Sequence, residues 1–190
     1  MKLLILDGLT AEQAATLRHG VWLDALARAR GWSPATLSLR TLTIAPCTGC
    51  FGCWLRTPGI CVTDDDGRAV LKQLVQSDGV ILLTPVKFGG YSALLKRALD
   101  RIIPMISPFF STVNGETHHR LRYARQPRFG ALGLMGDDDA EEAQTFRTLA
   151  ARNALNWHEP RPAVALVRAD ADETATRAAL QAAFNTAGWP

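Results

Sequence analysis

Apolar positions along the chain follow two different spacings, and the two spacings alternate from one segment to the next. Residues 2–6 and 79–83 are short, nearly continuous apolar runs, as expected of strands that are buried on both faces. Residues 10–30 and 91–103 instead repeat apolar side chains at helical spacing. The same alternation predicts further strands over 35–42, 129–135 and 162–167 and further helices over 67–76, 140–155 and 171–187.

Five strands, each followed by a helix, predict a parallel sheet with helices on both faces. At this length the pattern favours an α/β, flavodoxin-like, doubly wound five-stranded sheet with strand order 2-1-3-4-5. A six-stranded Rossmann-type half is the rival, but no Gly-x-Gly-x-x-Gly turn follows the first strand. We expect a single flavodoxin-like domain over 1–190, with a cysteine-bearing loop at 44–66 and an irregular insertion at 104–127.

Composition narrows the class of protein. Hydrophobic residues make up 47% and charged residues 21% of the 190 residues, which is typical of a globular protein. The net charge is only +3 and no long block of one sign occurs, so we expect no nucleic-acid or membrane partner. Asp7 and Gly8 cut the first apolar run too short for a secretion signal, and we expect a cytoplasmic protein.

Polar residues mark several expected helix starts. Thr10 with Gln13 has the spacing of a capping box. The aspartate runs 64–66 and 137–139 each precede a predicted helix, where carboxylates accept free N–H groups and favour the positive end of the helix dipole. We therefore interpret both runs as helix caps rather than as metal sites.

Loops that follow the first four strands hold most of the unusual residues. In a doubly wound sheet these loops meet at the carboxyl edge, where ligands bind. Residues 84–92 follow the most apolar strand and include the pair Gly89-Gly90, which lets the backbone approach a ligand closely. Free N–H groups there suit the polar edge of a planar heterocycle, and Phe88 or Tyr91 is expected to flank the ring. A plain strand-to-helix turn is the alternative.

All four cysteines lie within one loop. Their spacing is Cys-x2-Cys-x2-Cys-x7-Cys, and Gly49 and Gly52 allow tight turns between them. Three closely spaced thiolates followed by a fourth are typical of 4Fe-4S ligation. Zinc, a redox-active pair and unliganded thiols remain alternatives. The candidate metal ligands are Cys47, Cys50, Cys53 and Cys61.

Residues 84–96, followed by Asp100-Arg101, resemble the flavin-contacting segment of the NAD(P)H-dependent FMN reductases. This flavodoxin-like family includes the iron–sulfur flavoproteins, whose compact cysteine motif the loop ending at 61–66 also resembles. Lys87 is a departure, because a tyrosine is common there in the family. The resemblance implies bound FMN, with NAD(P)H as co-substrate. The residues implied to contact the ring are Pro85, Val86, Lys87, Phe88, Gly89, Gly90 and Gly136.

The loop after the first strand departs further from the family. Members carry a Gly-Ser-x-Arg stretch that cradles the FMN phosphate, whereas Leu9 and Ala11 stand here at the Ser and Arg positions. Asp7 and Glu12 oppose a dianion, and a capped helix without a ligand is the alternative. The residues that the resemblance and the helix start still offer to a phosphate are Gly8, Thr10, Thr16 and Arg18.

A basic, aromatic segment over 104–127 includes His118 and His119. We expect it near the binding edge, where it contacts the phosphates of the nicotinamide cofactor or a second subunit. Apolar residues in 104–113 favour the second role and predict a homodimer or homotetramer.

The expected activity is hydride transfer from NAD(P)H to FMN and then to a small acceptor such as a quinone or a flavin. No side chain is assigned as catalytic, because the flavin carries the chemistry. Two alternatives remain: an iron–sulfur flavoprotein that transfers electrons, and a non-enzymatic binding or redox-sensing module that has lost its flavin.

Overall fold

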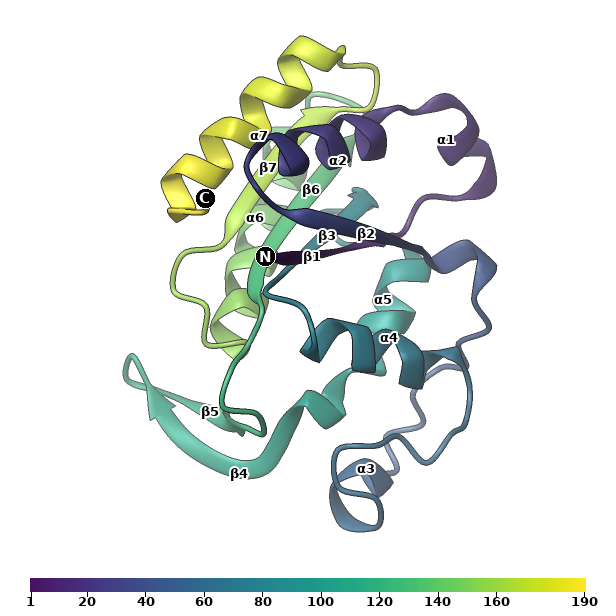
Figure 1. Ribbon diagram of the computed structural model, residues 1–190, viewed down its shortest axis with the longest axis vertical. Coiled ribbons are helices and arrows are strands. Elements are labelled where there is room, and N and C mark those ends of the chain that lie inside the picture. Colours follow the sequence, from purple (N-terminus) through teal and green to yellow (C-terminus); the bar gives the residue numbers. More distant parts are fainter.

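A five-stranded parallel sheet forms the centre of the computed structural model, which describes residues 1–190 (Figure 1). The strand order is β2-β1-β3-β6-β7, which confirms the expected flavodoxin-like topology. All four neighbouring pairs in this sheet are parallel. Its strands are β1 (Lys2–Asp7), β2 (Ser33–Ser38), β3 (Gly79–Pro85), β6 (Arg128–Met135) and β7 (Ala163–Arg168).

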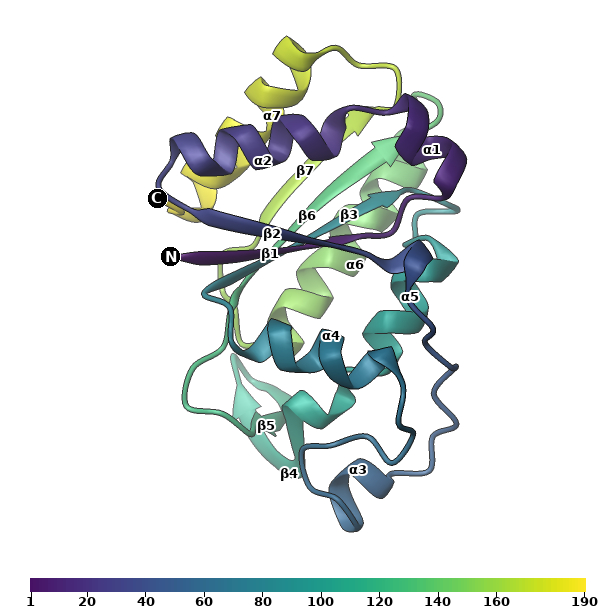
Figure 2. The same cartoon turned by 45° about the vertical axis from the view of Figure 1, so that its right-hand side comes forward.

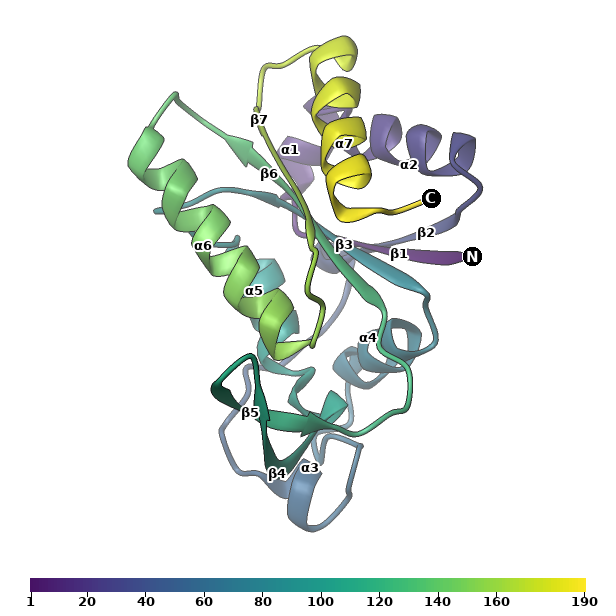
Figure 3. The ribbon, with the colours of Figure 1, turned by 90° about the vertical axis from the view of Figure 1, so that its left-hand side faces the viewer.

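Helices cover both faces of the sheet. Figure 2 shows α2 and α7 on one side and α4 and α5 on the other, and Figure 3 shows α6 across the sheet from α7. Two separate apolar cores result, one under each helical layer. The helices are α1 (Ala11–Thr16), α2 (His19–Ala29), α3 (Gly52–Leu55), α4 (Asp66–Val75), α5 (Ala93–Asp100), α6 (Ala140–Asn156) and α7 (Glu173–Ala187), with 3-10 turns at Leu39–Thr41 and Ile103–Met105.

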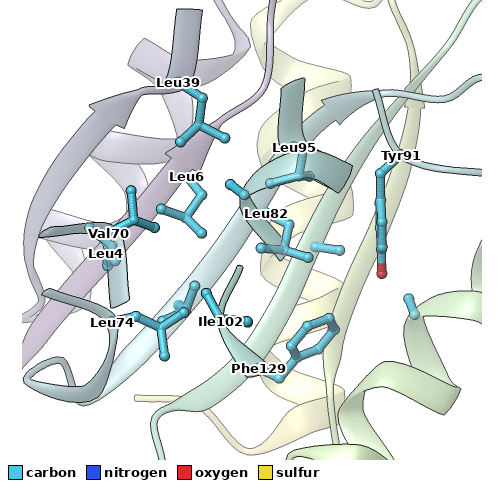
Figure 4. Close-up of a cluster of buried hydrophobic side chains, with 14 of the residues drawn as sticks. Leu4, Leu6, Leu39, Val70, Leu74, Leu82, Tyr91, Leu95, Ile102 and Phe129 are labelled. Atoms are coloured by element: carbon cyan, nitrogen blue, oxygen red, sulfur yellow. The ribbon is translucent and has the colours of Figure 1, made fainter. Parts of the chain in front are cut away.

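The central strand β3 is the most completely buried strand of the sheet. All seven of its residues are buried, in agreement with its continuous apolar sequence. Figure 4 shows Leu82 of this strand among Leu6, Leu95 and Phe129, which come from three other elements. Burying a side chain of this size contributes about 1.5–3 kcal/mol.

The first predicted helix is two helices in the structure. α1 ends at Thr16, Leu17 adopts an extended conformation, and α2 begins at His19. Leu17 packs against the core on that face of the sheet, and His19 is buried. The apolar spacing crosses this break without a visible interruption.

The second strand likewise ends earlier than predicted, because the chain forms a 3-10 turn at Leu39–Thr41.

Residues 104–127, which we expected to be irregular, contain an antiparallel hairpin. Its strands are β4 (Ile106–Val113) and β5 (Glu116–Leu121), and they form a separate two-stranded sheet. Asn114 and Gly115 both have positive φ, 51° and 82°, as a two-residue type I′ turn requires. This Asn-Gly pair is a strong hairpin signal that the sequence interpretation missed.

The hairpin does not lie at the binding edge of the sheet. It connects the end of α5 to the start of β6. In Figure 1 it lies at the lower end of the molecule near α3, away from the arrowheads of the sheet. His119 nevertheless lines a hollow of about 550 Å³ together with Gly90 and Tyr91 of the segment that follows β3, whereas His118 is not among the residues that line it. No helix of the structure has the length and apolar character required to span a bilayer.

Candidate functional site

Residues 84–92 form a tight turn after β3, at the carboxyl edge. Lys87 and Gly90 exchange backbone hydrogen bonds of 3.1 and 2.8 Å. Phe88 and Gly89 between them have φ of 51° and 72°, which makes the segment a two-residue hairpin turn. Its base is fixed because Pro85 and Val86 are buried and the Val86 N–H donates to the Leu134 carbonyl at 2.8 Å.

Gly89 packs against α6 rather than facing a ligand. A Cβ atom on Gly89 would lie 2.4 Å from the Thr145 side chain, and its N–H donates to the Glu142 carboxylate at 3.1 Å. The N–H groups of Lys87, Gly89 and Gly90 are thus all engaged within the protein. Of the donors expected to be free for a heterocycle, the structure leaves the N–H groups of Phe88 and Tyr91 without an acceptor within the protein.

The two aromatic residues of this segment have opposite environments. Phe88 is 99% exposed at the tip of the turn. Tyr91 is buried edge-on against Phe146, and its hydroxyl accepts a hydrogen bond from Asn153 at 2.9 Å. Burial raises the pKa of Tyr91 to about 12. Phe88 is therefore free to cover a planar ring, whereas Tyr91 is not.

Gly136 follows β6, the strand beside β3, and so lies at the same edge of the sheet. It is exposed, and a Cβ atom built on it meets no other atom within 4 Å. The exposed Phe88 and Lys87 and the open space at Gly136 fit a flat ligand lying on this edge.

The loop between β1 and α1 is closed by its own hydrogen bonds. The predicted capping box is confirmed, because the Thr10 hydroxyl accepts the Gln13 N–H and the Gln13 amide oxygen accepts the Thr10 N–H. The Leu9 N–H donates to the Asp7 carboxylate at 2.9 Å. The other oxygen of Asp7 pairs with Arg40 at 2.5 Å.

Gly8 serves a packing role at this loop. Its N–H donates to the Leu83 carbonyl, its carbonyl accepts the Ser92 hydroxyl, and a Cβ atom there would lie 2.7 Å from that hydroxyl oxygen. The Thr16 hydroxyl donates back to carbonyls of α1, and Arg18 is exposed at the start of α2. The donors that remain for a phosphate are the unpaired guanidinium of Arg18 and the N–H groups of Ala11 and Glu12 at the start of α1, for which the structure shows no acceptor.

The four cysteines line one hollow of about 30 Å³, together with Arg101 and Ile103. All four are free thiols; Cys47 and Cys50 are exposed, Cys61 is half-buried and Cys53 is buried. No three His, Cys, Asp or Glu side chains are arranged to hold a single metal ion. Four thiols around one hollow nevertheless match the donor set of a 4Fe-4S cluster, which is larger than a single ion.

The thiols differ in how readily they ionise. The Gly52 N–H and the Thr48 hydroxyl lower the pKa of Cys50, whereas burial and the neighbouring cysteines raise the pKa of Cys53. A metal bound by these residues would remove this difference, because cysteine binds metals as the thiolate.

Arg101 holds the cysteine loop in place, a role that the sequence interpretation missed. Its guanidinium is 1% exposed and makes two hydrogen bonds of 2.8 Å to the Asp65 carboxylate. It also donates to the carbonyls of Ala45 and Thr63, which lie on either side of the cysteines. Burial opposes ionisation of Asp65, but bonds from Arg101 and from the N–H groups of Ala45 and Gly67 outweigh it and lower its pKa.

Asp65 also caps α4 through the Gly67 N–H, and Asp139 caps α6 through two N–H groups, as predicted. The cysteine loop follows the second predicted strand, so we expected it to meet the turn at 84–92 at the carboxyl edge, and the structure corrects this. The hollow lies beside the end of α5, whereas the turn precedes its start. An eight-residue helix separates them by about 12 Å.

An aromatic stack links the cysteine loop to the hairpin. Ring centroids lie 5.2 Å apart from Phe51 to Trp54, 4.9 Å from Trp54 to His119 and 4.6 Å from His119 to Phe110. His118 is buried between Glu116 and Asn156, which fixes the hairpin to α6. His118 therefore has a structural role, whereas His119 lines the hollow that it shares with Gly90 and Tyr91.

Comparisons with known proteins agree with this architecture. The chain is 40% identical over 83 residues to an iron-sulfur flavoprotein of Methanocaldococcus jannaschii, covering 44% of this chain and 42% of that protein. It is 33% identical over 89 residues to an iron-sulfur flavoprotein of Methanosarcina thermophila, covering 47% and 46%. The chain thus matches less than half the length of these curated relatives.

Solved structures show the same fold at low identity. An FMN-dependent NADH-azoreductase from Bacillus anthracis in complex with FMN has a TM-score of 0.65 at 12% identity, covering 99% of this chain and 98% of its own. The NAD(P)H:quinone oxidoreductase from Methanothermobacter marburgensis has a TM-score of 0.65 at 13% identity, covering 98% and 97%. A family model described as NADPH-dependent FMN reductase matches residues 1–120, more than half of the chain. The chain belongs to the NADPH-dependent FMN reductase family.

Proposed function

We propose that the chain is a flavin-dependent NAD(P)H oxidoreductase with a small acceptor such as a quinone or a free flavin. Family membership carries this proposal, because FMN and NADPH are the flavin and the nicotinamide that the family description names. A bound flavin supplies two-electron transfer between the nicotinamide and the acceptor. Two of the solved structures with a similar fold are an azoreductase and a quinone oxidoreductase, and these names are consistent with a small acceptor.

The protein's own contribution at the carboxyl edge is to seat and cover the ring. Pro85 and Val86 provide a buried, rigid base, and the Gly89–Glu142 hydrogen bond fixes the turn to α6. Phe88 stands exposed above this base, so its phenyl ring is available to stack on the flavin. The open space at Gly136 accommodates the far side of the ring.

Replacing Phe88 tests this placement. We expect Phe88→Ala to weaken flavin binding about two- to tenfold, which corresponds to one aromatic contact, without lowering the melting temperature. Phe109→Ala is the matched control, because Phe109 is also an exposed phenylalanine but lies on the hairpin. Flavin affinity is measured by fluorescence quenching, and turnover by NAD(P)H oxidation with a soluble quinone. A protein that binds no added flavin would instead support the binding-module alternative.

A second candidate function is electron transfer through an iron–sulfur cluster. The arrangement of Cys47, Cys50, Cys53 and Cys61 around one hollow favours it, and the relatives cited above carry the name iron-sulfur flavoprotein. Anaerobic reconstitution is expected to give about four irons per chain with a broad visible absorbance. Cys53→Ser should remove most of this iron, and Ser111→Ala on the hairpin should not. Iron content that is independent of the cysteines would contradict the cluster.

We also propose that the chain forms a homodimer or homotetramer through the lower end of the molecule in Figure 1. Five of the eight exposed large apolar side chains belong to the cysteine loop and the hairpin, which the aromatic stack joins: Phe51, Leu55, Ile60, Phe109 and Phe110. Exposed apolar groups gathered in this way are typical of interaction surfaces. Phe110→Asp should reduce the mass measured by light scattering to that of a monomer, whereas Val21→Asp should not.

A further inference from the structure

The hollow of about 550 Å³ that His119 lines has no part in the proposed function. Its volume is within the usual range for pockets that hold small ligands. The residues that line it come from α5, from α6 and from the hairpin. They begin with Gly90 before α5 and include Met105 after it, so the hollow follows α5 along its whole length.

Most of the wall of this hollow is apolar. Leu99 on α5 and Leu149 on α6 line it and are half-buried. Three rings line it as well, those of Tyr91, His119 and Trp157. Apolar walls bind apolar ligands because both surfaces leave water, and aromatic rings pack well against other flat rings. The wall therefore suits a flat, mainly apolar molecule.

The lysine and the aspartate in the wall neutralise each other. Lys96 and Asp100 both line the hollow, and their ion pair spans 2.5 Å. Neither of them therefore offers an unpaired charge to a phosphate or a carboxylate. The donors that remain for the phosphate of FMN, on Arg18 and at the start of α1, are not among the lining residues. The hollow thus favours a neutral ligand.

One buried donor in the wall has no partner. The Tyr91 hydroxyl accepts the Asn153 amide N–H at 2.9 Å, but its own hydrogen has no acceptor within the protein. Tyr91 is 9% exposed, and its raised pKa keeps the hydroxyl protonated at neutral pH. The Nδ1 atom of His119 is likewise buried without a hydrogen-bond partner. Buried polar groups are usually hydrogen-bonded, so a ligand that brings an acceptor would complete this wall.

We propose that this hollow is a separate binding site for a neutral, flat aromatic molecule that carries a carbonyl group. The rings of the ligand pack against the apolar wall, and its carbonyl oxygen accepts the hydrogen bond of the Tyr91 hydroxyl. The site goes beyond the proposed function, because binding here requires no flavin. It adjoins the turn at Gly90 and the cysteine hollow at Ile103, which lines both hollows.

Three naphthalene derivatives of similar size test the proposal on the full chain. Methyl naphthyl ketone carries the carbonyl group, ethylnaphthalene lacks it, and naphthoate has a charged carboxylate instead. Calorimetry and quenching of tryptophan fluorescence measure binding, since Trp157 lines the hollow. We expect the ketone to bind about two- to tenfold more tightly than the hydrocarbon, and about tenfold or more tightly than the anion. Equal affinities for all three, or no binding of the ketone, would overturn the proposal.

Tyr91→Phe tests the hydrogen bond, because it removes the hydroxyl and keeps the ring. The ketone should lose about two- to tenfold in affinity, whereas the affinity for ethylnaphthalene should change by less than about twofold. A circular dichroism melt checks that the variant is folded. Equal losses for the two ligands, or no loss for the ketone, would show that the hydroxyl does not recognise the carbonyl.

Leu149→Trp tests the place of binding, because the larger side chain fills part of the hollow. We expect it to abolish binding of the ketone. Arg147→Trp is the matched control, since Arg147 is exposed, lies about 200° around α6 from Leu149 and does not line the hollow. Unchanged ketone binding in Leu149→Trp would overturn the proposal. Conversion of an oligomer to a monomer in the same variant, measured by light scattering, would show that a second subunit covers the hollow instead.

Saturation with FMN separates this site from the site of the flavin, whose ring is also flat and carries carbonyl groups. We expect the Kd of the ketone to stay within about threefold when FMN is bound, as for uncoupled sites. Displacement of the ketone by FMN would place the flavin ring in the hollow and overturn the proposal, while the proposed function would stand. A chain that binds the ketone but no FMN would contradict the proposed function and support this site.

Discussion

Arg101 and Asp65 illustrate what single residues contribute to this fold. The pair is almost completely buried, with side chains 1% and 10% exposed, and it joins α5 to the start of α4 and to both ends of the cysteine loop. A buried ion pair adds modest net stability, but removing one partner leaves the other charge without compensation.

We therefore expect Arg101→Met to lower the free energy of unfolding by about 3–5 kcal/mol. Urea denaturation followed by circular dichroism measures this. Arg125→Met is the control, because Arg125 is 84% exposed in its pair with Asp78 and should cost less than about 1 kcal/mol. Equal losses in the two variants would show that burial does not govern the contribution of these pairs.

The same pair predicts a pH dependence. The pKa of Asp65 is lower in the folded protein than in the unfolded chain, so its contribution to stability is complete above the unfolded value near 3.9 and is lost as the pH falls through the folded value. The melting temperature should therefore fall less steeply between about pH 5 and pH 3 in Asp65→Asn than in the wild type. Parallel pH profiles for the two proteins would refute this assignment.

At this scale some site residues could be predicted and others could not. The Thr10–Gln13 capping box and the Asp65 and Asp139 caps follow from local spacing, because each bond spans at most three residues. The role of Arg101 depends on contacts with residues 36 and 56 positions away. Nothing in the local sequence signals such partners.

Among the elements, the strands and most of the helices were predictable because burial imposes a regular apolar period. The hairpin was not recognised, because Pro108 and the exposed residues Phe109 and Phe110 obscure its alternation. The burial pattern of β4 is correspondingly irregular. The split between α1 and α2 was also missed, since Leu17 is apolar whether the helix continues or stops there.

The turn of the hairpin supplies a test at this scale. Gly115 has φ of +82°, and a Cβ atom there meets open space, so Gly115→Ala should cost only the backbone strain, about 1–2 kcal/mol. Differential scanning calorimetry measures the loss. Gly136→Ala, which also meets open space but has no positive φ, should cost much less. A neutral Gly115→Ala would show that the turn does not need this conformation.

In the molecule as a whole, two cores of 22 and 18 buried residues share one sheet. β3 contributes side chains to both, with Leu82 facing one core and Leu83 the other. The fold class could be predicted because this alternation of faces repeats along the whole chain. The positions of the cysteine hollow and of the hairpin could not, because they depend on where long connections pack.

Truncating one buried side chain of the central strand should therefore lower the stability of the whole molecule. Leu82 is completely buried, and Leu82→Ala is expected to lower the free energy of unfolding by about 2–5 kcal/mol. Leu55→Ala is the comparison, since that side chain is 78% exposed, and should stay within about 0.5 kcal/mol. Equilibrium urea unfolding with one common transition for both cores would show that they unfold together.

The bonds from Arg101 to Ala45 and Thr63 have one further consequence. They hold both ends of a segment that contains every cysteine of the chain, and the Trp54–Ile106 hydrogen bond and the aromatic stack attach the middle of this segment to the hairpin. The entropy of bringing its ends together is already spent during folding. A metal bound by these thiols would therefore bind to a loop whose two ends are already fixed to the rest of the protein.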